Sequence, residues 1–431
     1  MRISIFYRNV FEPGGAPVGI RHLANRLAKR HDVALWGHAT DDEWPLLDGV
    51  QQRSYVGRSE LARRLPGWIA TDAPEILLIV GFFLPDNIPV VRAARRAGVS
   101  TVLHPMAQVW DSALKGKIFT HGCDVRALEK KRINRDGLVA RVSNWLNPAA
   151  KRAFMHSVGR AMGLGTDAVA VLSDDERTQF QSYFPRPDRD FVTMEWGVDE
   201  LETMPDDSAH FFRDTLGVSM DRPNLIVWSR LDWHYKGLDR LLNGVAEVKR
   251  RQSNVPFRLY LCGPDYREGS VLARQFIAQH GLQDDVFVFL PGDYTPGSKT
   301  PLRDADASVL LSRWDGSPRA LRESLLFGTP VLVSPETNFA GIVERYGCGD
   351  SVRDADDASA VADMLLRTTD AAQLQRWTAA TQTASDDSHW DTIAGRLAQD
   401  FHHIAERPVA RTVAERVGRA LASFAPAGVR A

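Results

Sequence analysis

The sequence predicts an α/β protein built from two doubly wound parallel sheets. Short apolar runs of strand length alternate with amphipathic stretches of helical spacing along most of the 431 residues. Such alternation is typical of parallel sheets that carry helices on both faces. The pattern stops near residue 205 and then restarts, which indicates two domains of ordinary size. We place the first domain at residues 1–204, the second at 205–388, and a C-terminal helix with a basic tail at 389–431.

In the first domain, each expected element is an apolar run or a helical stripe. Strands are expected at residues 3–7, 33–36, 76–80, 99–103 and 168–172, with a helix around residues 90–97. Apolar residues at helical spacing follow the first strand: Ile20, Leu23, Ala24, Leu27 and Ala28. Residues 197–207 are acidic and contain Pro205, which is typical of a linker.

The second domain repeats the pattern. Strands are expected at residues 224–228, 258–262, 286–290, 307–311 and 331–334. A helical stripe follows the first of these strands: Leu238, Leu241, Leu242, Val245 and Val248. Ligands of such folds bind at the carboxyl ends of parallel strands, so a cleft between the two domains is the expected site.

Composition excludes several classes of protein. Hydrophobic residues at 44% and charged residues at 25% are typical of a globular chain, and a net charge of −1 argues against wholesale nucleic-acid binding. No apolar run reaches the ~18 residues that a membrane-spanning helix needs. Cys123, Cys262 and Cys348 are far apart in sequence, which favours free thiols in a reducing compartment. Because a strand begins at residue 3, we expect no signal peptide and a cytoplasmic protein.

Residues 315–323, Asp-Gly-Ser-Pro-Arg-Ala-Leu-Arg-Glu, place two carboxylates around the start of a helix. We expect Ser317 as the N-cap, Pro318 at the first helical position and Gly328 at the end. A helix N-terminus binds anions, so Asp315 and Glu323 on its two sides are placed to hold hydroxyl groups at both ends of a diphosphate. A turn residue at Asp315 and an exposed helix residue at Glu323 are the simpler alternatives.

Cations and glycines follow other strand ends. Arg230 and Lys236 lie after the first strand of the second domain, where they can neutralise a diphosphate; solvated surface charges are the alternative. Gly14 and Gly15 precede the first helix and allow the backbone to approach a phosphate closely. They do not complete a GxGxxG pattern, so a nicotinamide cofactor is not supported.

His104 ends the strand at residues 99–103, where it can donate a hydrogen bond to a sugar hydroxyl or orient it; a buried structural histidine is the alternative. Asp304-Ala-Asp306 and Asp354-Ala-Asp356 have the form of metal-binding Asp-x-Asp. The first precedes a buried strand and the second lies in a polar loop, so we assign no metal site. The chain contains no CxxC, HExxH, P-loop or nucleophile elbow.

Together these motifs resemble the retaining GT-B glycosyltransferases of family 4, glycosyl transferases group 1, over nearly the whole chain. The matching pieces follow the family's order: Gly14-Gly15, His104, Glu195-Trp-Gly-Val-Asp199, Arg230 to Gly237, Leu261-Cys-Gly-Pro264 and residues 315–323. The last two resemble the family's xGxGP turn and E-x7-E element, and the Arg230 segment resembles GRLxxxKG. The resemblance implies two Rossmann-like domains facing a cleft, with a C-terminal helix, expected at residues 390–404, that crosses back to the first domain.

The resemblance also implies a role for each motif. Glu323 would hold the ribose hydroxyls of a nucleotide-sugar. Arg230 and Lys236 would bind its diphosphate, helped by backbone N–H groups near Gly15 and Ser317. Asp315 would face the donor sugar, and His104 would touch it from the other domain. The other residues expected at the donor site are Gly263, Leu290, Gly316, Pro318 and Arg319, with Gly263-Pro264 and residues 290–296 near the base.

The implied reaction is sugar transfer from a UDP- or GDP-linked donor, with retention, through an oxocarbenium-like state and without a metal cofactor. Cations and helix termini would stabilise the charge of the leaving diphosphate. Three residues depart from the family pattern. Ser229 stands where the family usually has glycine, Ser324 where it has alanine, and Asp315 where it has the first Glu. The shorter side chain of Asp315 withdraws the carboxylate by roughly 1.5 Å.

Two basic segments bear on the acceptor and on location. Residues 105–165 hold eleven Lys and Arg against four acids, a net of +7, together with Trp110, Phe119 and Trp145. Residues 407–431 hold five Arg against Glu415, a net of +4. One interpretation is a glycan or lipid-linked acceptor in cell-surface polysaccharide or glycoconjugate synthesis, with peripheral contact to an acidic membrane surface. Solvated helices are the alternative.

Other functions on the same fold stay open at this point. A nucleotide-sugar epimerase would need further acid–base groups around the sugar, and no second carboxylate pair lies near the motifs. A phosphorylase would need a pyridoxal lysine, and none is convincing. The departures at Ser229 and Asp315 also leave room for a catalytically silent protein that binds nucleotide-sugars.

Overall fold

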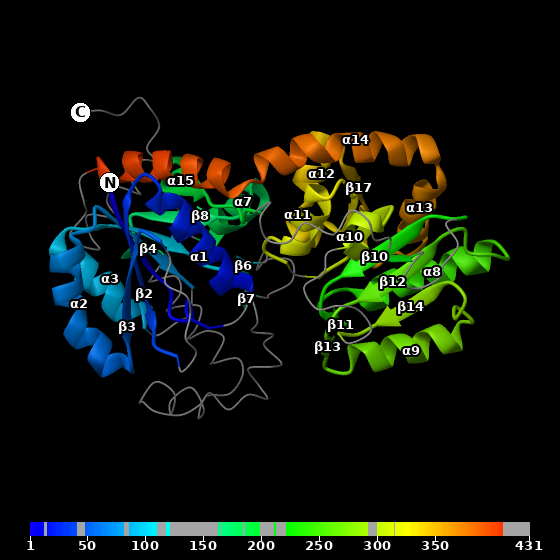
Figure 1. The fold of residues 1–431 in the computed structure, drawn as a ribbon, viewed down its shortest axis with the longest axis horizontal. Coiled ribbons are helices and arrows are strands. Elements are labelled where there is room, and N and C mark those ends of the chain that lie inside the picture. The colour runs from blue at the N-terminus through cyan, green and yellow to red at the C-terminus, as the bar shows by residue number, and fades with distance from the viewer. Residues whose placement is uncertain are drawn as a thin grey trace. The chain divides into compact units, whose positions relative to one another are not determined.

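The computed structural model divides the chain into two compact units, whose helices and strands are labelled in Figure 1. The first unit comprises Met1–Trp196 and Trp390–Ala431, and the second Gly197–His389. The structure describes residues 1–12, 15–40, 48–81, 86–109, 118–120, 163, 165–183, 186–198, 211–212, 221–291, 300–313 and 315–407. Among these residues, no helix is both long and apolar enough to cross a membrane.

The first unit is built on a seven-stranded parallel sheet in the order β3-β2-β1-β4-β5-β8-β9. The strands are β1 (Arg2–Phe6), β2 (Asp32–His38), β3 (Val50–Tyr55), β4 (Ile76–Val80), β5 (Ser100–His104), β8 (Ala168–Val171) and β9 (Phe191–Thr193). The helices and short elements are α1 (Gly15–Ala28), α2 (Arg58–Asp72), α3 (Asn87–Ala97), α7 (Asp174–Tyr183), η1 (Asp188–Asp190) and α15 (Trp390–Ala405). A two-stranded antiparallel ribbon adds β6 (Ala107–Val109) and β7 (Ile118–Thr120).

Helices cover both faces of this sheet, which explains why the central strand β4 is apolar throughout. In β4, alternate residues enter opposite cores: Ile76, Leu78 and Val80 on one face, and Leu77 and Ile79 on the other. The first core includes residues of α1 and α15, which lie side by side (Figure 1), and the second includes residues of α2 and α3. The expected C-terminal helix at 390–404 is thus present as α15, packed in the core of the first unit.

The second unit is built on a six-stranded parallel sheet in the order β14-β12-β10-β15-β16-β17. Its strands are β10 (Asn224–Trp228), β12 (Arg258–Cys262), β14 (Val286–Phe289), β15 (Ala307–Leu310), β16 (Val331–Val333) and β17 (Gly349–Ser351). A separate parallel pair joins β11 (Leu231–Asp232) to β13 (Asp265–Tyr266). Strand order runs away from β10 in both directions, so the topological switch point lies between β10 and β15.

The helices of the second unit cover both faces of its sheet (Figure 1). They are α8 (Leu238–Arg251), α9 (Gly269–Gln279), α10 (Thr300–Asp304), α11 (Arg319–Leu326), α12 (Ala340–Tyr346), α13 (Ala358–Leu366) and α14 (Ala371–Asp387), with η4 (Pro335–Thr337) and η5 (Arg367–Thr369). The two faces are visible in β15, where Val309 packs in the core of α8 and Leu310 in that of α11. Adjacent residues of one strand therefore hold the two helices that flank the switch point.

The α/β fold with two parallel sheets is confirmed, and each expected strand appears, with bounds that match or differ by one or two residues. Three further strands, β3, β9 and β17, lie at sheet edges and were not predicted. Residues 199–207 of the expected linker lie outside the described residues, as do Gly14, Cys123, Trp110, Trp145, most of the basic segment 105–165 and residues 408–431. Cys262 and Cys348 are buried free thiols.

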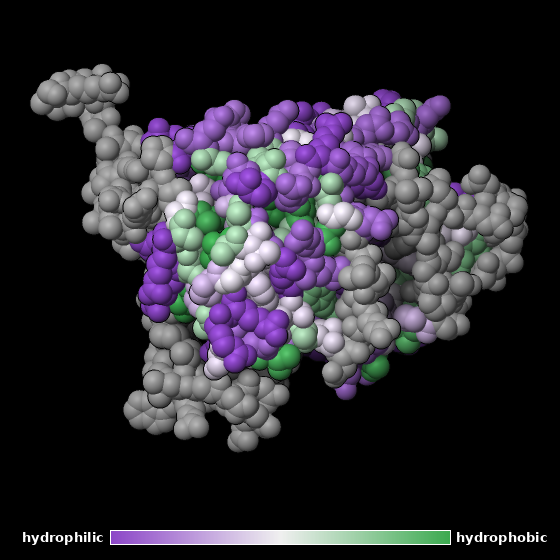
Figure 2. Space-filling model, turned by 60° about the vertical axis from the view of Figure 1, so that its left-hand side comes forward, coloured by the Kyte–Doolittle hydropathy of each residue, from purple (hydrophilic) through white to green (hydrophobic). Residues whose placement is uncertain are grey.

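Described surface residues are mostly hydrophilic on the face that Figure 2 shows, with smaller hydrophobic areas between them. Large apolar side chains that stand exposed in the described part of the chain are Val56, Val271 and Leu272. Val271 and Leu272 are neighbours on α9, whereas Val56 follows an edge strand of the first unit. Isolated exposed apolar residues of this kind are ordinary on a folded surface.

Candidate active site at the edge of the second sheet

The sequence motifs of the second unit meet at the carboxyl ends of adjacent strands. The loop with Arg230 and Lys236 follows β10, Gly263 follows β12, and Leu290 follows β14. The loop with Asp315 follows β15, the strand on the other side of β10. Open α/β sheets bind ligands at the switch point beyond the carboxyl ends of their strands. The fold therefore places both cations and Asp315 where a ligand is expected.

The two loops at the switch point are joined by an ion pair between Lys236 and Asp315. The Lys236 ammonium donates a hydrogen bond to Oδ2 of Asp315, and the side chains are only 13% and 4% exposed. Ser312 donates a second hydrogen bond to the same oxygen, at 3.4 Å. Lys236 and Asp315 are thus largely shielded from water and orient each other. Solvated surface charges would be neither shielded nor fixed in this way.

Two glycines allow the loops to approach closely. Gly237 has φ +67°, and a Cβ atom there would lie 1.9 Å from the carbonyl oxygen of Leu311. At Gly263, a Cβ atom would lie 1.8 Å from the carbonyl oxygen of Ser229. Any side chain at either position would push the backbones apart, so glycine is required in both turns.

Aromatic rings hold the second cation. The guanidinium carbon of Arg230 lies 5.0 Å from the ring centroid of Tyr235 and 4.6 Å from that of Tyr266. Lys236 also lies over Tyr235, with 5.4 Å from Nζ to the centroid. Burial, and then the charge of Asp315, raise the pKa of the Tyr235 phenol, so this ring stays neutral beside the cations. The rings of Tyr235 and Tyr266 were not identified from the sequence.

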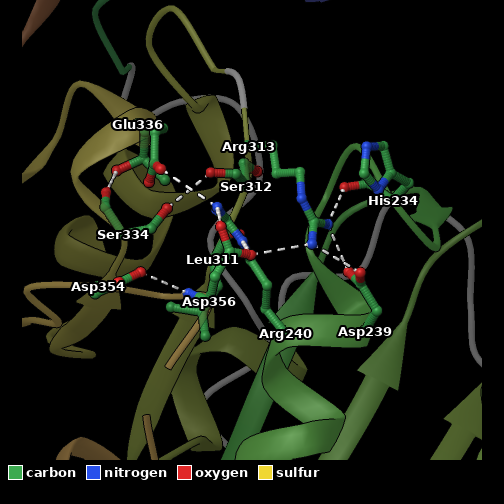
Figure 3. A network of polar contacts seen from close by, with 11 residues as sticks. His234, Asp239, Arg240, Leu311, Ser312, Arg313, Ser334, Glu336, Asp354 and Asp356 are labelled. Carbon is green, nitrogen blue, oxygen red and sulfur yellow. Dashed lines mark hydrogen bonds and ion pairs between the residues drawn. The ribbon is translucent and has the colours of Figure 1, made fainter. Parts of the chain in front are cut away.

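Two arginines, Arg240 and Arg313, connect the same loops (Figure 3). Arg240 on α8 is buried and binds Asp356 through two hydrogen bonds, at 2.8 and 2.7 Å. It also donates to Glu336 at 3.3 Å and to the carbonyl oxygen of Leu311 at 3.4 Å. Arg240 therefore connects the helix after Lys236 to the end of the strand that leads to Asp315.

Arg313 makes the reciprocal connection from the Asp315 loop (Figure 3). It binds Asp239 through two hydrogen bonds of 2.7 and 2.8 Å and donates to the carbonyl oxygen of His234 at 2.8 Å. Its second contact to Asp356, at 3.2 Å, joins it to Arg240. The Asp356 side chain is 59% exposed, so water weakens its contacts, whereas the Arg313–Asp239 pair is more sheltered, at 16% and 20%. The network joins the two loops at several points.

The backbone around Asp315 is fixed as well. Its N–H donates to the carbonyl oxygen of Glu336 at 3.0 Å, and Asn338 donates to the carbonyl oxygen of Asp315 at 3.0 Å and to that of Gly316 at 3.4 Å. Ser334 donates to the carbonyl oxygen of Ser312 at 2.8 Å. The segment after β16 thus supports the loop after β15.

The start of the following helix corrects one prediction. α11 begins at Arg319, Pro318 occupies the cap position with ψ 112°, and no side chain caps the helix. Ser317 is therefore not the N-cap, and Pro318 is not the first helical residue. The cause is that Pro318 adopts an extended conformation, while the Ser317 hydroxyl accepts a hydrogen bond from Arg322 at 3.3 Å.

Glu323 lies in the second turn of α11 and is buried. Arg319, one turn earlier, donates to Oε1 of Glu323 at 3.0 Å. Arg322 is also buried, donates to Ser388 at 2.8 Å and lies over the ring of Phe339. The exposed-helix interpretation of Glu323 is therefore wrong, because its side chain is only 8% exposed.

His104 belongs to the first unit, at the carboxyl end of β5, and is fully buried. Its Nδ1 lies 3.2 Å from the carbonyl oxygen of Ala170, which can only accept, so Nδ1 carries the proton. Nε2 is then an acceptor, and it has no hydrogen-bond partner in the described part of the chain. Burial lowers the pKa of the ring to about 4. The His104 ring is therefore neutral, with Nε2 as its acceptor atom.

Trp196, from the segment Glu195-Trp-Gly-Val-Asp199, holds His104 in place. Trp196 contacts the imidazole edge-on, with 5.7 Å between ring centroids, and packs edge-on against Trp390. Its ring also lies against α1, where a Cβ atom at Gly19 would come within 2.5 Å of it. Gly15, the first residue of the same helix, is the described part of the glycine pair.

The remaining predicted residues have structural partners. Leu290 packs against the core of the second unit, and residues 292–296 lie outside the described residues. The Asp-x-Asp carboxylates bind protein groups: Asp306 accepts from the backbone of Asn224 at 2.7 Å, Asp304 from Arg303 at 2.8 Å, and Asp354 from the backbone of Asp356 at 3.0 Å.

Comparisons with known proteins agree with this architecture. Residues 209–383 match the model of the family glycosyl transferases group 1. A structure of HepE from Anabaena in complex with UDP matches 94% of this chain and all of its own, with a TM-score of 0.68 and 16% identity. Sucrose-phosphate synthase from Thermosynechococcus elongatus matches 93% of this chain and 98% of its own, with a TM-score of 0.65 and 16% identity.

A third structure, WaaG, a glycosyltransferase involved in lipopolysaccharide biosynthesis, matches 92% of this chain and 98% of its own, with a TM-score of 0.59 and 15% identity. A search of curated protein sequences finds no match to this chain. The fold agreement covers both units, and the family match covers most of the second. The chain therefore has the GT-B fold of these structures, and most of its second unit matches the glycosyl transferases group 1 family.

Proposed function

We propose that this protein transfers a sugar, with retention, from a UDP- or GDP-linked donor to a hydroxyl group of a glycan, lipid-linked or other polar acceptor. The observation that carries the proposal is the juxtaposition of Arg230, Lys236 and Asp315 at the switch point of the second sheet. Two sheltered cations that share one aromatic ring form a binding surface for a diphosphate.

The donor is proposed to lie along the carboxyl edge of this sheet. Arg230 and Lys236 bind the diphosphate, Glu323 the ribose, and Asp315 with Gly316 the transferred sugar. A uridine donor is supported by the complexes of Anabaena HepE with UDP and with UDP-glucose, since that protein shares the fold. In the first unit, we propose Nε2 of His104 as an acceptor for a sugar hydroxyl, because this atom has no hydrogen-bond partner among the described residues.

The proposed chemistry follows from where charge develops. The bond between the sugar and the diphosphate breaks, and its electrons leave with the phosphate oxygen, which Arg230 and Lys236 stabilise. The acceptor hydroxyl attacks the same face of the sugar, and its proton passes to the departing phosphate oxygen. Because two side-chain cations neutralise the leaving group, we propose that no metal ion is required.

Binding and turnover are tested in sequence. Thermal shift with UDP, GDP, ADP and dTDP identifies the base, and hydrolysis of the matching sugar nucleotides with chelator present tests metal independence. We expect Lys236→Ala and Glu323→Ala to abolish transfer without loss of fold, whereas Arg250→Ala, at an exposed position of α8, retains it. NMR of the product's anomeric configuration tests retention.

The outcomes separate the competing functions. If none of the four nucleotides raised the melting temperature, the proposal would be refuted. Nucleotide binding without hydrolysis or transfer would identify a catalytically silent binding protein, and interconversion of the donor sugar an epimerase. Wild-type rates in Lys236→Ala would place the site elsewhere.

A cytoplasmic location with peripheral contact to an acidic membrane surface is also proposed, on the charge of residues 105–165 and 407–431. Flotation with anionic liposomes, with and without residues 407–431, tests this contact. Equal flotation of both proteins would remove the tail from the proposal.

A further inference from the structure

Among the described residues, the Arg230 side chain combines an unpartnered buried nitrogen with contacts to two aromatic rings. Its Nε atom is buried and has no hydrogen-bond partner in the described part of the chain. Its guanidinium carbon lies over two tyrosine rings, 5.0 Å from the centroid of Tyr235 and 4.6 Å from that of Tyr266. A sheltered guanidinium whose neighbours are ring faces still requires acceptors for its N–H groups. An incoming anion supplies them.

Tyr266 reaches Arg230 through a dedicated piece of backbone. β11 and β13 pair in parallel outside the main sheet, with Asp232 opposite Tyr266, and the N–H of Leu231 donates to the carbonyl oxygen of Pro264 at 2.8 Å. Gly263 permits this approach, as its close contact with Ser229 shows. Asp265 accepts from the backbone of Ser270 at 2.7 Å, which anchors the pair to α9.

The two rings are not equivalent. Tyr235 also lies over Lys236 and is affected by the charge of Asp315, so its removal would disturb both cations. Tyr266 lies over Arg230 and over the exposed Arg267, whose guanidinium carbon is 5.1 Å from the ring centroid. Substitution of Tyr266 therefore tests the orientation of Arg230 without touching the Lys236–Asp315 pair.

We propose that Tyr266 is a positioning residue that fixes the Arg230 guanidinium for the diphosphate of the donor. This proposal rests on the function proposed above. An arginine side chain carries roughly 2 kcal/mol of rotamer entropy, and stacking on an aromatic ring reduces the freedom that is lost when the anion binds. The contribution of Tyr266 therefore appears in diphosphate affinity and not in recognition of the base.

The experiment compares Tyr266→Leu with Tyr266→Phe in the full chain. Titration calorimetry measures the affinity for UDP, GDP and inorganic pyrophosphate. Saturation-transfer NMR titrations measure the affinity for uridine and guanosine. Because a sheltered cation–π contact contributes up to about 2 kcal/mol, we expect Tyr266→Leu to weaken diphosphate binding about ten-fold and nucleoside binding less than about two-fold. Tyr266→Phe keeps the ring face and should stay within about two-fold of wild type.

A double-variant cycle with Arg230→Ala completes the test. In that background, Tyr266→Leu should cause no further loss of diphosphate affinity. Tyr346→Leu is the matched control, because its ring carries Arg345 at 5.1 Å on α12, away from the strand ends at β10 and β15; it should bind as wild type does.

Each failure has a distinct cause. Diphosphate binding that Tyr266→Leu leaves unchanged, or equal losses for nucleoside and diphosphate, would overturn the role of Tyr266 alone. A further loss in the Arg230→Ala background would show that Tyr266 acts through another group. A wild-type chain that binds neither nucleotide nor pyrophosphate would overturn the proposed function together with this inference.

Discussion

Buried His104 should make the stability of the first unit depend on pH. Burial lowers the pKa of its ring from 6.5 to about 4, so the folded state favours the neutral form. The full stability of the folded state is present above the unfolded pKa. It falls as the pH drops from 6.5 toward 4, because in that range the unfolded chain binds a proton at His104 and the folded chain does not. A shift of this size corresponds to about 3 kcal/mol in all, of which about 2.5 kcal/mol is lost by about pH 4.5.

The assay is urea unfolding of wild type and His104→Asn between about pH 7.5 and 4.5. Asparagine can still donate a hydrogen bond to the carbonyl oxygen of Ala170 but cannot titrate. Between the two pH values, the unfolding free energy of the variant should therefore rise by about 2.5 kcal/mol relative to that of wild type. Glu176, whose pKa burial raises to about 8, contributes the opposite slope to both proteins and cancels. His402→Asn, at an exposed position of α15, is the control. Parallel pH profiles for wild type and His104→Asn would refute the buried neutral ring.

Three further outcomes follow from the second unit. Gly237→Ala and Gly281→Ala both place alanine at a positive φ, +67° and +64°, but only the new Cβ atom at Gly237 would collide with backbone atoms. We expect urea unfolding to show a loss of about 1 kcal/mol in unfolding free energy for Gly281→Ala and of more than about 3 kcal/mol for Gly237→Ala. Asp315→Glu should alter donor preference in a panel of sugar nucleotides; an unchanged panel would make the shorter acid incidental. Arg240→Met should lower unfolding free energy by about 2 kcal/mol, against less than about 0.5 for exposed Arg250→Met.

The fold was predictable where strands are buried on both faces. β4, Ile-Leu-Leu-Ile-Val, is apolar throughout because helices cover both sides of it. The missed strand β3, Val-Gln-Gln-Arg-Ser-Tyr, sits at the sheet edge and buries only its two ends. β17, Gly-Asp-Ser, is also an edge strand and carries no apolar run. Edge strands are specified by their neighbours, so periodicity alone does not reveal them.

The site was predictable in its motifs but not in its contacts. Strand–loop–helix order located Arg230, Lys236 and Asp315 at strand ends, because parallel strands bring their carboxyl ends to one edge. The ion pair between Lys236 and Asp315 joins residues 79 positions apart, and no local pattern encodes it. Tyr266 was missed for the same reason, since its role depends on the pairing of β11 with β13.

Several independent contacts fix the loop that carries Asp315. Asp315 is tied through its side chain to Lys236 and through its backbone to Glu336 and Asn338. Arg240 and Arg313 then join the two loops in opposite directions. Because these contacts fix the position of the loop, the length of the acidic side chain determines the position of its carboxylate. We therefore expect the shorter acid to change the reach of one side chain and not the shape of the loop.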